Sequence, residues 1–364
     1  MRRGARHAER QHAEHPGGAH RDGARLLPHR GAHPVPRRGA RQGAQAHAPP
    51  RAPGRRPRAE ADPEAGAGGI LALREARRPK QWTKNLLVFA GVVFALQASH
   101  PDLLVRATAG FLGFSLLAGT VYLVNDLRDV AADRVHPRKR HRPLASGRLP
   151  VGLAWGAVPV LLVAVGALAA WLGAAYAAVL VAYLVLNLAY SYALKHQVIL
   201  DVFVIAAGFV LRAVAGVALL LPIAPDTPLS AWLLVCTFFG ALFLAVSKRR
   251  RELANAGEAA MQQRAVLAAY TPELLDRMLT VAAACTLMSY ALYTIWPATV
   301  AKFGSEALIV TVPIVAYAVF RYLHLVRVSE TAEDPSQVLV SDRPIQYAVL
   351  AFVALAVWIL YAAR

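Results

Sequence analysis

Apolar residues fill long stretches from about residue 85 to the end of the chain, and short polar segments separate these stretches. A helix needs about 20 mainly apolar residues to cross the hydrocarbon core of a membrane. Most of the stretches reach that length, so the pattern predicts an all-α, polytopic membrane protein with about nine transmembrane helices. The expected helices are 85–98, 104–124, 151–171, 174–194, 201–221, 229–247, 274–297, 305–326 and 345–363.

The polar segments between the predicted helices alternate in charge along the chain. One set is rich in Lys and Arg, and the opposite set contains almost none. Because basic loops stay in the cytoplasm, the amino terminus is expected inside and the carboxyl terminus outside. We therefore expect a multi-pass protein of the plasma membrane whose functional face points to the cytoplasm. The basic set comprises 77–84, 128–148, 195, 248–251 and 327–343.

Composition separates the first 69 residues from the rest. The whole chain is 56% apolar with a net charge of +18, and residues 1–69 hold 14 Arg, no Lys and six acidic residues. Such a segment cannot build an apolar core. We interpret residues 1–69 as a disordered basic extension or a start codon assigned too far upstream, with contact to anionic lipids as the alternative. We expect residues 70–364 to form one transmembrane domain, which carries the function of the chain.

Three carboxylates follow the second apolar stretch at helical spacing: Asp126, Asp129 and Asp133. At about 100° per residue, Asp126 and Asp133 share nearly one side of a helix, and Asp129 lies about 60° away. Asn125 precedes Asp129 by one turn. Carboxylates this close repel one another, and Mg²⁺ held jointly with substrate phosphates would remove the repulsion. The pattern predicts a metal site formed by the three aspartates.

A basic run follows the aspartates directly. Its residues Arg134, Lys139, Arg140 and Arg142 could take the remaining charge of a phosphate ligand. The simpler interpretation is a charged, solvated loop at the membrane edge, but such loops rarely combine three aspartates on one helical face with so many cations. The combination predicts a site for a diphosphate and its metal.

Other polar residues lie near the same predicted membrane face. Asn187, Ser191 and Lys195 are spaced as one stripe along a helix. Lys195 is then either a phosphate-binding charge or a lysine that reaches the interface. Asp201 is either a metal ligand or a favourable charge at a helix N-terminus. Arg212 lies deeper and is expected to face the interior of the bundle, without a catalytic role.

The segment before the first helix and the run after the sixth add further cations. Lys84 is a candidate for phosphate contact at the membrane edge, close to an interfacial Trp82. Arg250 and Arg251 are interpreted as ordinary positive charge on the cytoplasmic side. The separated polar segments would form one polar mouth above an apolar bundle, which suits a ligand with a charged head and an apolar tail. The two cysteines, Cys236 and Cys285, lie in apolar stretches and indicate neither a disulfide nor a zinc site.

The chain carries two motifs, Asn125-Asp126-x-x-Asp129-x-x-x-Asp133 after the second predicted helix and Tyr-Ser-x-x-Leu-Lys after the fourth. In these two motifs it resembles the UbiA superfamily of intramembrane prenyltransferases. The resemblance covers about residues 74–364. It implies that the first aspartate motif holds Mg²⁺ and the diphosphate of a donor substrate.

Three strings of residues resemble one branch of that family, the decaprenyl-phosphate phosphoribosyltransferases. They are Arg-Pro-Lys-Gln-Trp-Thr-Lys-Asn (78–85), Asp-Arg-x-His-Pro-x-Lys-Arg-x-Arg-Pro (133–143) and Leu-Lys-His-Gln (194–197). Enzymes of that branch transfer 5-phosphoribose from phosphoribosyl diphosphate to a polyprenyl (decaprenyl) phosphate for cell-wall arabinan synthesis. The second Asp-x-x-x-Asp motif of the aromatic prenyltransferases is missing from 248–253, which fits a lipid monophosphate acceptor better.

The resemblance implies a role for each matching residue. Asp126 and Asp129, supported by Asp133, would hold Mg²⁺ on the leaving diphosphate, and Asn125 would fix the donor or the metal. Lys84, Arg134, Lys139, Arg140, Arg142, Tyr190 and Lys195 would bind the substrate phosphates. The expected partners are phosphoribosyl diphosphate, a polyprenyl phosphate and the lipid bilayer; nucleic acid is not expected, and self-assembly of the chain is left open.

Two alternatives remain at this point. The first is a prenyltransferase that moves a polyprenyl chain from its diphosphate to an aromatic acceptor. The second is a transporter, but transporters place their polar groups near the middle of the membrane, and here the charges crowd one face.

Overall fold

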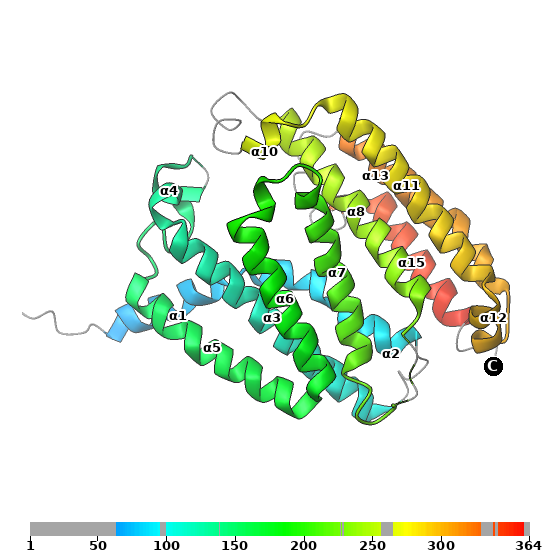
Figure 1. Ribbon diagram of the computed structural model, residues 1–364, viewed down its shortest axis with the longest axis horizontal. Helices are drawn as coiled ribbons and strands as arrows, with labels where there is room; N and C mark the ends of the chain where they lie inside the picture. The colour runs from blue at the N-terminus through cyan, green and yellow to red at the C-terminus, as the bar shows by residue number, and fades with distance from the viewer. Residues whose placement is uncertain are drawn as a thin grey trace, which may run out of the picture. The chain divides into compact units, whose positions relative to one another are not determined.

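The computed structural model describes residues 63–359 except 95–99, 138, 226, 228, 256–264, 329–337 and 339–340. Every regular element in this described part is helical (Figure 1). The chain divides into a unit of residues 1–58, which lies outside the described residues, and a unit Ala59–Arg364. The main helices are α1 (Pro63–Ala76), the 3₁₀ helix η1 (Pro79–Phe89), α2 (Ala90–Phe94), α3 (Pro101–Arg128), α4 (Val130–Val135), α5 (Val151–Leu172), α6 (Ala174–Tyr192), α7 (Leu200–Ala218), α8 (Ala231–Ala254), α10 (Ala265–Ala268), α11 (Pro272–Ile295), α12 (Pro297–Phe303), α13 (Val312–Val328) and α15 (Arg343–Val357).

Seven helical segments in the described residues are long and apolar enough to cross a membrane. They correspond to seven of the nine predicted spans, and the count of nine is not confirmed. The predicted span 85–98 falls on η1 and α2, and its last residues lie outside the described part. The predicted span 345–363 falls on α15, which has 15 residues. Helix α1 begins at Pro63, within the segment 1–69 that composition had set apart.

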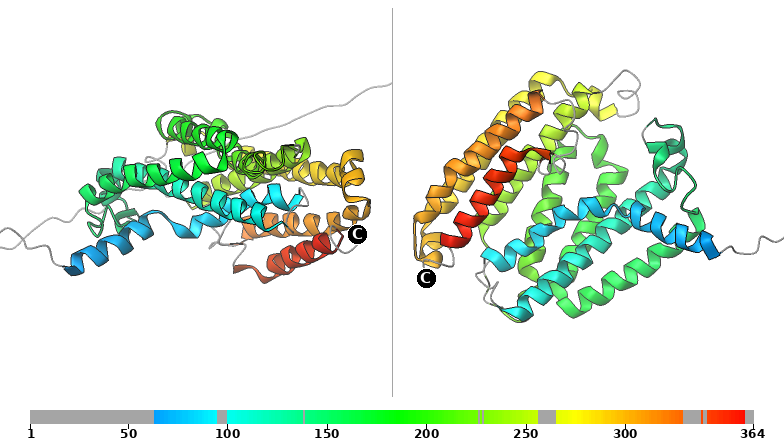
Figure 2. Two further views of the ribbon diagram at one scale, coloured as in Figure 1. Left: turned by 90° about the horizontal axis from the view of Figure 1, so that it is seen from below. Right: turned by 180° about the vertical axis from the view of Figure 1, so that it is seen from behind.

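Two apolar clusters form the core of the bundle, and α7 contributes to both. One cluster joins the second half of α7 to η1, α3, α5 and α6. The other joins the first half of α7 to α8, α11, α13 and α15. Helix α7 is therefore the shared wall between the two groups of helices. In the right view of Figure 2, seen from behind, η1 and α2 cross the near side of the bundle, and both contact α7.

Two glycines allow α2 and η1 to lie directly against α7. A Cβ atom on Gly91 would lie 2.1 Å from the carbonyl oxygen of Gly216, and one on Gly216 would lie 2.2 Å from the carbonyl oxygen of Val88. Side chains cannot occupy such positions without separating the backbones. The absence of a Cβ at both positions therefore sets the distance between these two segments.

A buried arginine joins the same segments in the interior of the bundle. Arg212 of α7 donates to Asn85 Oδ1 (2.7 Å), to the Gly208 carbonyl (2.7 Å) and to the Tyr183 hydroxyl (3.0 Å). Asn85 in turn donates to Ser115 Oγ of α3 (2.9 Å). The prediction that Arg212 faces the interior is confirmed, and its hydrogen bonds explain how a charge is accommodated there.

Polar side chains connect successive helices at one end of the bundle. Asn125 at the end of α3 meets Ser191 at the end of α6, and Asp201 at the start of α7 meets Arg249 near the end of α8. Further links join α8 to α11, α8 to α13, and α13 to Asp342, which precedes α15. In Figure 1 this polar end carries the short helices α4 and α10.

Candidate active site

Helix α3 carries the aspartate motif to the polar end and stops inside it. Asp129 has φ −93° and ψ 6°, and α4 starts at the next residue. The spacing had predicted one continuous helix for the three aspartates. The structure shows instead that the helix is interrupted at Asp129. The backbone N–H of Asp133 still donates to the Asp129 carbonyl at 2.8 Å, so the chain keeps its helical direction and Asp126 and Asp133 remain on one side.

Asp126 and Asp133 converge on a single guanidinium. Arg142 Nη1 donates to Asp126 Oδ1 at 3.1 Å and to Asp133 Oδ2 at 2.6 Å. Lys139 Nζ lies 3.8 Å from Asp133 Oδ1. Both carboxylates are buried, with side chains 4% and 3% exposed. The basic run that follows α4 thus folds back over the aspartates through Lys139 and Arg142, and the predicted contact of these two residues with a phosphate stays a prediction.

Arg78 is a site residue that sequence reasoning did not select. Its Nη2 donates to Asp126 Oδ1 at 2.6 Å, and its guanidinium lies 4.7 Å from the centre of the Tyr122 ring. The backbone of Arg78 is left-handed (φ 53°, ψ 61°), which is costly for a residue with a Cβ. This conformation joins α1 to η1. The only signal in the sequence was its place as the first residue of the string 78–85.

Asn125 anchors the end of α3 to the end of α6. Its Oδ1 accepts from Ser191 Oγ at 3.0 Å. Arg128 donates to the Ser191 carbonyl at 3.1 Å and lies 4.3 Å from the centre of the Tyr192 ring. These contacts fix the position of Asp126, the next residue in the chain. In this structure Asn125 thus contacts α6, and a direct role toward the donor or the metal stays a prediction.

A second charged cluster lies between α6, α7 and α8. Arg249 donates to Asp201 Oδ2 (2.5 Å), Glu252 Oε2 (2.5 Å) and the Tyr190 hydroxyl (3.2 Å). Tyr270 donates to Asp201 Oδ1 at 2.6 Å, and burial together with this hydrogen bond raises the pKa of Tyr270. Asp201 is completely buried and bonded through both oxygens. Arg249 was not selected from the sequence, because it lies in a run of four adjacent cations.

The structure also corrects the interpretation of two neighbouring features. Helix α6 ends at Tyr192, so Lys195 lies in a separate 3₁₀ turn and does not extend the predicted stripe of Asn187 and Ser191. Arg251, interpreted as ordinary surface charge, is buried and donates to the Leu325 carbonyl of α13.

The contacts described above for Asp126 and Asp133 do not include five further predicted site residues: Lys84, Asp129, Arg134, Arg140 and Lys195. Arg134 and Arg140 are exposed, and neither forms an ion pair with a described residue. Asp129, Lys84 and Lys195 are half-buried. Asp129 forms no hydrogen bond or ion pair through its side chain within the described part. Their roles toward a substrate stay predictions.

The carboxylate oxygens of Asp126 and Asp133 are suitable ligands for a hard cation, but two carboxylates alone do not complete its coordination. Among the described residues there is no group of three or more His, Cys, Asp or Glu side chains placed to hold a metal ion. Oxygens of Asp126 and Asp133 nevertheless meet at one positively charged nitrogen. Mg²⁺ takes oxygen ligands and uses one or two carboxylates plus substrate phosphates. The pair therefore fits a magnesium ion held jointly with a phosphate ligand.

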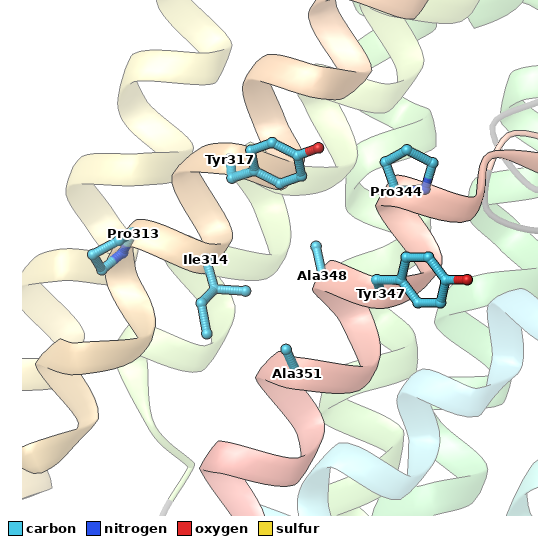
Figure 3. Close-up of a pocket in the computed structure, with 7 residues that line it drawn as sticks. All are labelled: Pro313, Ile314, Tyr317, Pro344, Tyr347, Ala348 and Ala351. Atoms are coloured by element: carbon cyan, nitrogen blue, oxygen red, sulfur yellow. The ribbon is translucent and has the colours of Figure 1, made fainter.

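An apolar groove of about 600 Å³ lies between α13 and α15. Figure 3 shows Tyr317 of α13 and Tyr347 of α15 on its two walls. None of the residues that line this groove is charged. The groove therefore differs in character from the charged Asp126–Asp133 site.

Comparison with known proteins identifies the family of this chain. Residues 86–341 match the UbiA prenyltransferase family. The chain belongs to this family. A UbiA homolog from Archaeoglobus fulgidus bound to GPP and Mg²⁺ has a similar fold, with a TM-score of 0.60 and 18% sequence identity over 79% of this chain and 99% of that one. At this identity the likeness shows the fold alone.

Two relatives are similar over most of their length. The decaprenyl-phosphate phosphoribosyltransferase of Mycolicibacterium smegmatis is 39% identical over 64% of this chain and 74% of that protein. The enzyme of the same name from Mycobacterium tuberculosis is 36% identical over 78% of this chain and 93% of that protein. The resemblance inferred from the sequence motifs is thus confirmed for the family and its branch.

Proposed function

We propose that this UbiA-family protein transfers 5-phosphoribose from phosphoribosyl diphosphate to a polyprenyl phosphate such as decaprenyl phosphate, with Mg²⁺ as cofactor, and releases diphosphate. The observation that carries the proposal is the buried Asp126–Asp133 pair surrounded by Arg78, Arg142 and Lys139. A metal–diphosphate is held by one or two carboxylates on the cation and by further cations on the phosphate oxygens. The names of the relatives favour a phosphoribosyl donor and a decaprenyl phosphate acceptor.

In this proposal the chain's own residues bind and orient the donor. Asp126 and Asp133 would hold Mg²⁺, which neutralises charge on the diphosphate when bound. Arg142 now lies between the two carboxylates, so its guanidinium is close enough to contact the diphosphate oxygens instead. Asn125 keeps the end of α3 in place through Ser191. Lys139 and Arg78 supply further positive charge around the same position.

The transfer follows from the charges of the reactants. An oxygen of the lipid phosphate forms a bond to C1 of the ribose while the bond from C1 to the diphosphate oxygen breaks, and the diphosphate leaves with the electron pair. The acceptor oxygen is already anionic, so no strong base is needed. Positive charge fixed around the leaving group stabilises the transition state more than the ground state. Attack opposite the leaving group turns an α donor into a β product.

The location of the reaction is part of the proposal. The described parts of the basic loops and the aspartate site lie at the same polar end of the bundle, and basic loops favour the cytoplasm. We therefore place the site on the cytoplasmic face of the plasma membrane, where a phosphorylated sugar donor is soluble and the lipid acceptor is held in the bilayer. The product would serve as a precursor for cell-wall arabinan.

The test uses membranes with Mg²⁺, labelled phosphoribosyl diphosphate and decaprenyl phosphate. We expect label in the lipid fraction for the wild type, loss of the signal with a metal chelator, and its return with added Mg²⁺. Asp126→Asn should lower kcat by about a hundredfold or more, since it removes a ligand that acts on the developing charge.

Asp102→Asn is the matched control, because Asp102 is exposed at the opposite end of the same helix α3. It should leave the rate unchanged. If the wild type transfers no label but attaches a prenyl group from its diphosphate to an aromatic acid, the aromatic prenyltransferase is the correct function. If neither reaction occurs, transport becomes the better interpretation.

A further inference from the structure

A cavity of about 520 Å³ lies beside the aspartate site, between α1 and η1. Its walls include three cationic side chains, Arg74, Arg78 and Lys80, together with Leu71 and Glu75. Arg74 and Lys80 are exposed and form no ion pair with any described residue. Arg74 and Lys80 therefore offer positive charge that no described carboxylate neutralises, whereas Arg78 is paired with Asp126.

Glu75, the one carboxylate among the residues that line the cavity, already forms an ion pair with Arg148. Arg148 donates to both oxygens of Glu75, at 2.6 and 2.9 Å. This bidentate contact lowers the pKa of Glu75 and compensates its charge. A bound anion would thus meet the three cations, while Glu75 remains occupied by Arg148.

The wall of the cavity is shared with the aspartate site. Arg78 lines the cavity and also donates to Asp126 at 2.6 Å. An anion held by Arg78 would therefore lie one side chain away from the carboxylates that are proposed to hold the donor. A phosphate in the cavity would therefore be a neighbour of the proposed donor site.

The helix beside the cavity exposes apolar side chains next to its cations. Ile70 is 69% exposed and Leu71 is 66% exposed. At about 100° per residue, Ile70, Leu71 and Arg74 lie within about 100° of one another around α1. The opposite face, with Ala72 and Ala76, is buried in the cluster that α1 forms with α3 and α5. The exposed face thus combines an apolar surface with a cation.

We propose that this cavity binds the phosphate of the lipid acceptor, with Arg74, Arg78 and Lys80 around the phosphate and Ile70 and Leu71 against the start of its apolar chain. The proposal rests on the phosphoribosyl transfer proposed above and names the residues that hold its second substrate. A water-soluble anion would use the cations but would gain nothing from the exposed Ile70 and Leu71. The combination therefore favours a lipid phosphate monoester.

The test measures steady-state transfer in neutral phosphatidylcholine proteoliposomes, with decaprenyl phosphate and phosphoribosyl diphosphate varied in turn. Arg74→Gln/Lys80→Gln should raise the KM for decaprenyl phosphate about tenfold or more, since the variant removes two of the three cations proposed to contact the phosphate. The KM for phosphoribosyl diphosphate should stay within about twofold of the wild type. Arg74→Lys/Lys80→Arg keeps both charges and should restore most of the acceptor affinity.

The matched control removes two other cations from the same polar end. Arg277 of α11 and Arg327 of α13 are exposed and form no ion pair with a described residue. Arg277→Gln/Arg327→Gln changes the net charge equally and should leave both KM values unchanged. An equal rise in the acceptor KM for this control would overturn the proposal, since general surface charge would then attract the lipid.

Two further outcomes would also overturn the proposal. A rise in the KM for phosphoribosyl diphosphate alone would assign the cavity to the donor, and an unchanged acceptor KM in Arg74→Gln/Lys80→Gln would exclude the cavity as its site. Both outcomes require an active wild type, so they are distinct from failure of the proposed reaction. Direct binding of decaprenyl phosphate, measured without donor, should weaken in the same variant and give a readout that does not depend on turnover.

Discussion

Arg249→Met removes the central cation of the buried cluster between α6, α7 and α8. The Arg249 side chain is 2% exposed and Asp201 is fully buried, so Asp201 would lose its ion pair at a position without access to water. Breaking a buried ion pair by removing one partner costs about 3–5 kcal/mol. Tyr270 would still donate to Asp201, and we therefore expect a loss of about 3 kcal/mol, near the lower limit of that range.

The neighbouring residue offers a matched control on the same helix. Arg250 also forms an ion pair, with Asp276 at 2.9 Å, but both side chains are partly exposed, 25% and 32%. Exposed ion pairs contribute about 0–1 kcal/mol, so Arg250→Met should change stability by no more than that. Both variants remove one positive charge and insert the same side chain.

The assay is a denaturant titration of the detergent-solubilised protein, followed by circular dichroism. A double variant, Asp201→Asn/Arg249→Met, tests the cause of the loss. It also replaces the Asp201 carboxylate, which has lost its ion-pair partner, and should recover part of the stability that Arg249→Met loses. If Arg249→Met and Arg250→Met unfold at the same denaturant concentration, the electrostatic reasoning about the buried cluster is wrong.

Two further predictions concern packing and pH. Gly216→Ala should destabilise the fold by about 1–3 kcal/mol in the same titration, since its Cβ would lie 2.2 Å from the Val88 carbonyl oxygen; Gly240→Ala, where the nearest atom is 4.0 Å away, should be tolerated. The hydrogen bond from Arg321 lowers the pKa of Asp342. The ionised Asp342 therefore stabilises the fold fully above the ordinary aspartate pKa of about 4, and this contribution is lost as the pH falls through the lowered pKa. Unfolding midpoints at pH 6 and pH 3 should differ more for the wild type than for Asp342→Asn, and equal differences would contradict this role.

The transmembrane character and the aspartate site could be predicted because both are local in the chain. The length of an apolar stretch decides whether a helix can span a bilayer, and seven such segments are helices in the structure. Asp133 and Arg142, which form a hydrogen bond, are only nine positions apart, so the acidic and basic parts of the motif are neighbours already in the chain. The boundaries were less certain, because the break at Asp129 and the end of α6 at Tyr192 interrupt patterns that the spacing alone continues.

Only the tertiary structure decided which cation meets which carboxylate across the bundle. Arg78 and Asp126 are 48 positions apart, as are Arg249 and Asp201. Several neighbouring cations could have served in each place, and their residue type does not distinguish them. The choice follows from how deeply each helix face is buried and from the left-handed turn at Arg78. The sequence by itself determined the membrane bundle and its acidic motif, whereas helix packing selected Arg78 and Arg249, because the partner of a buried charge depends on contacts that a linear pattern does not contain.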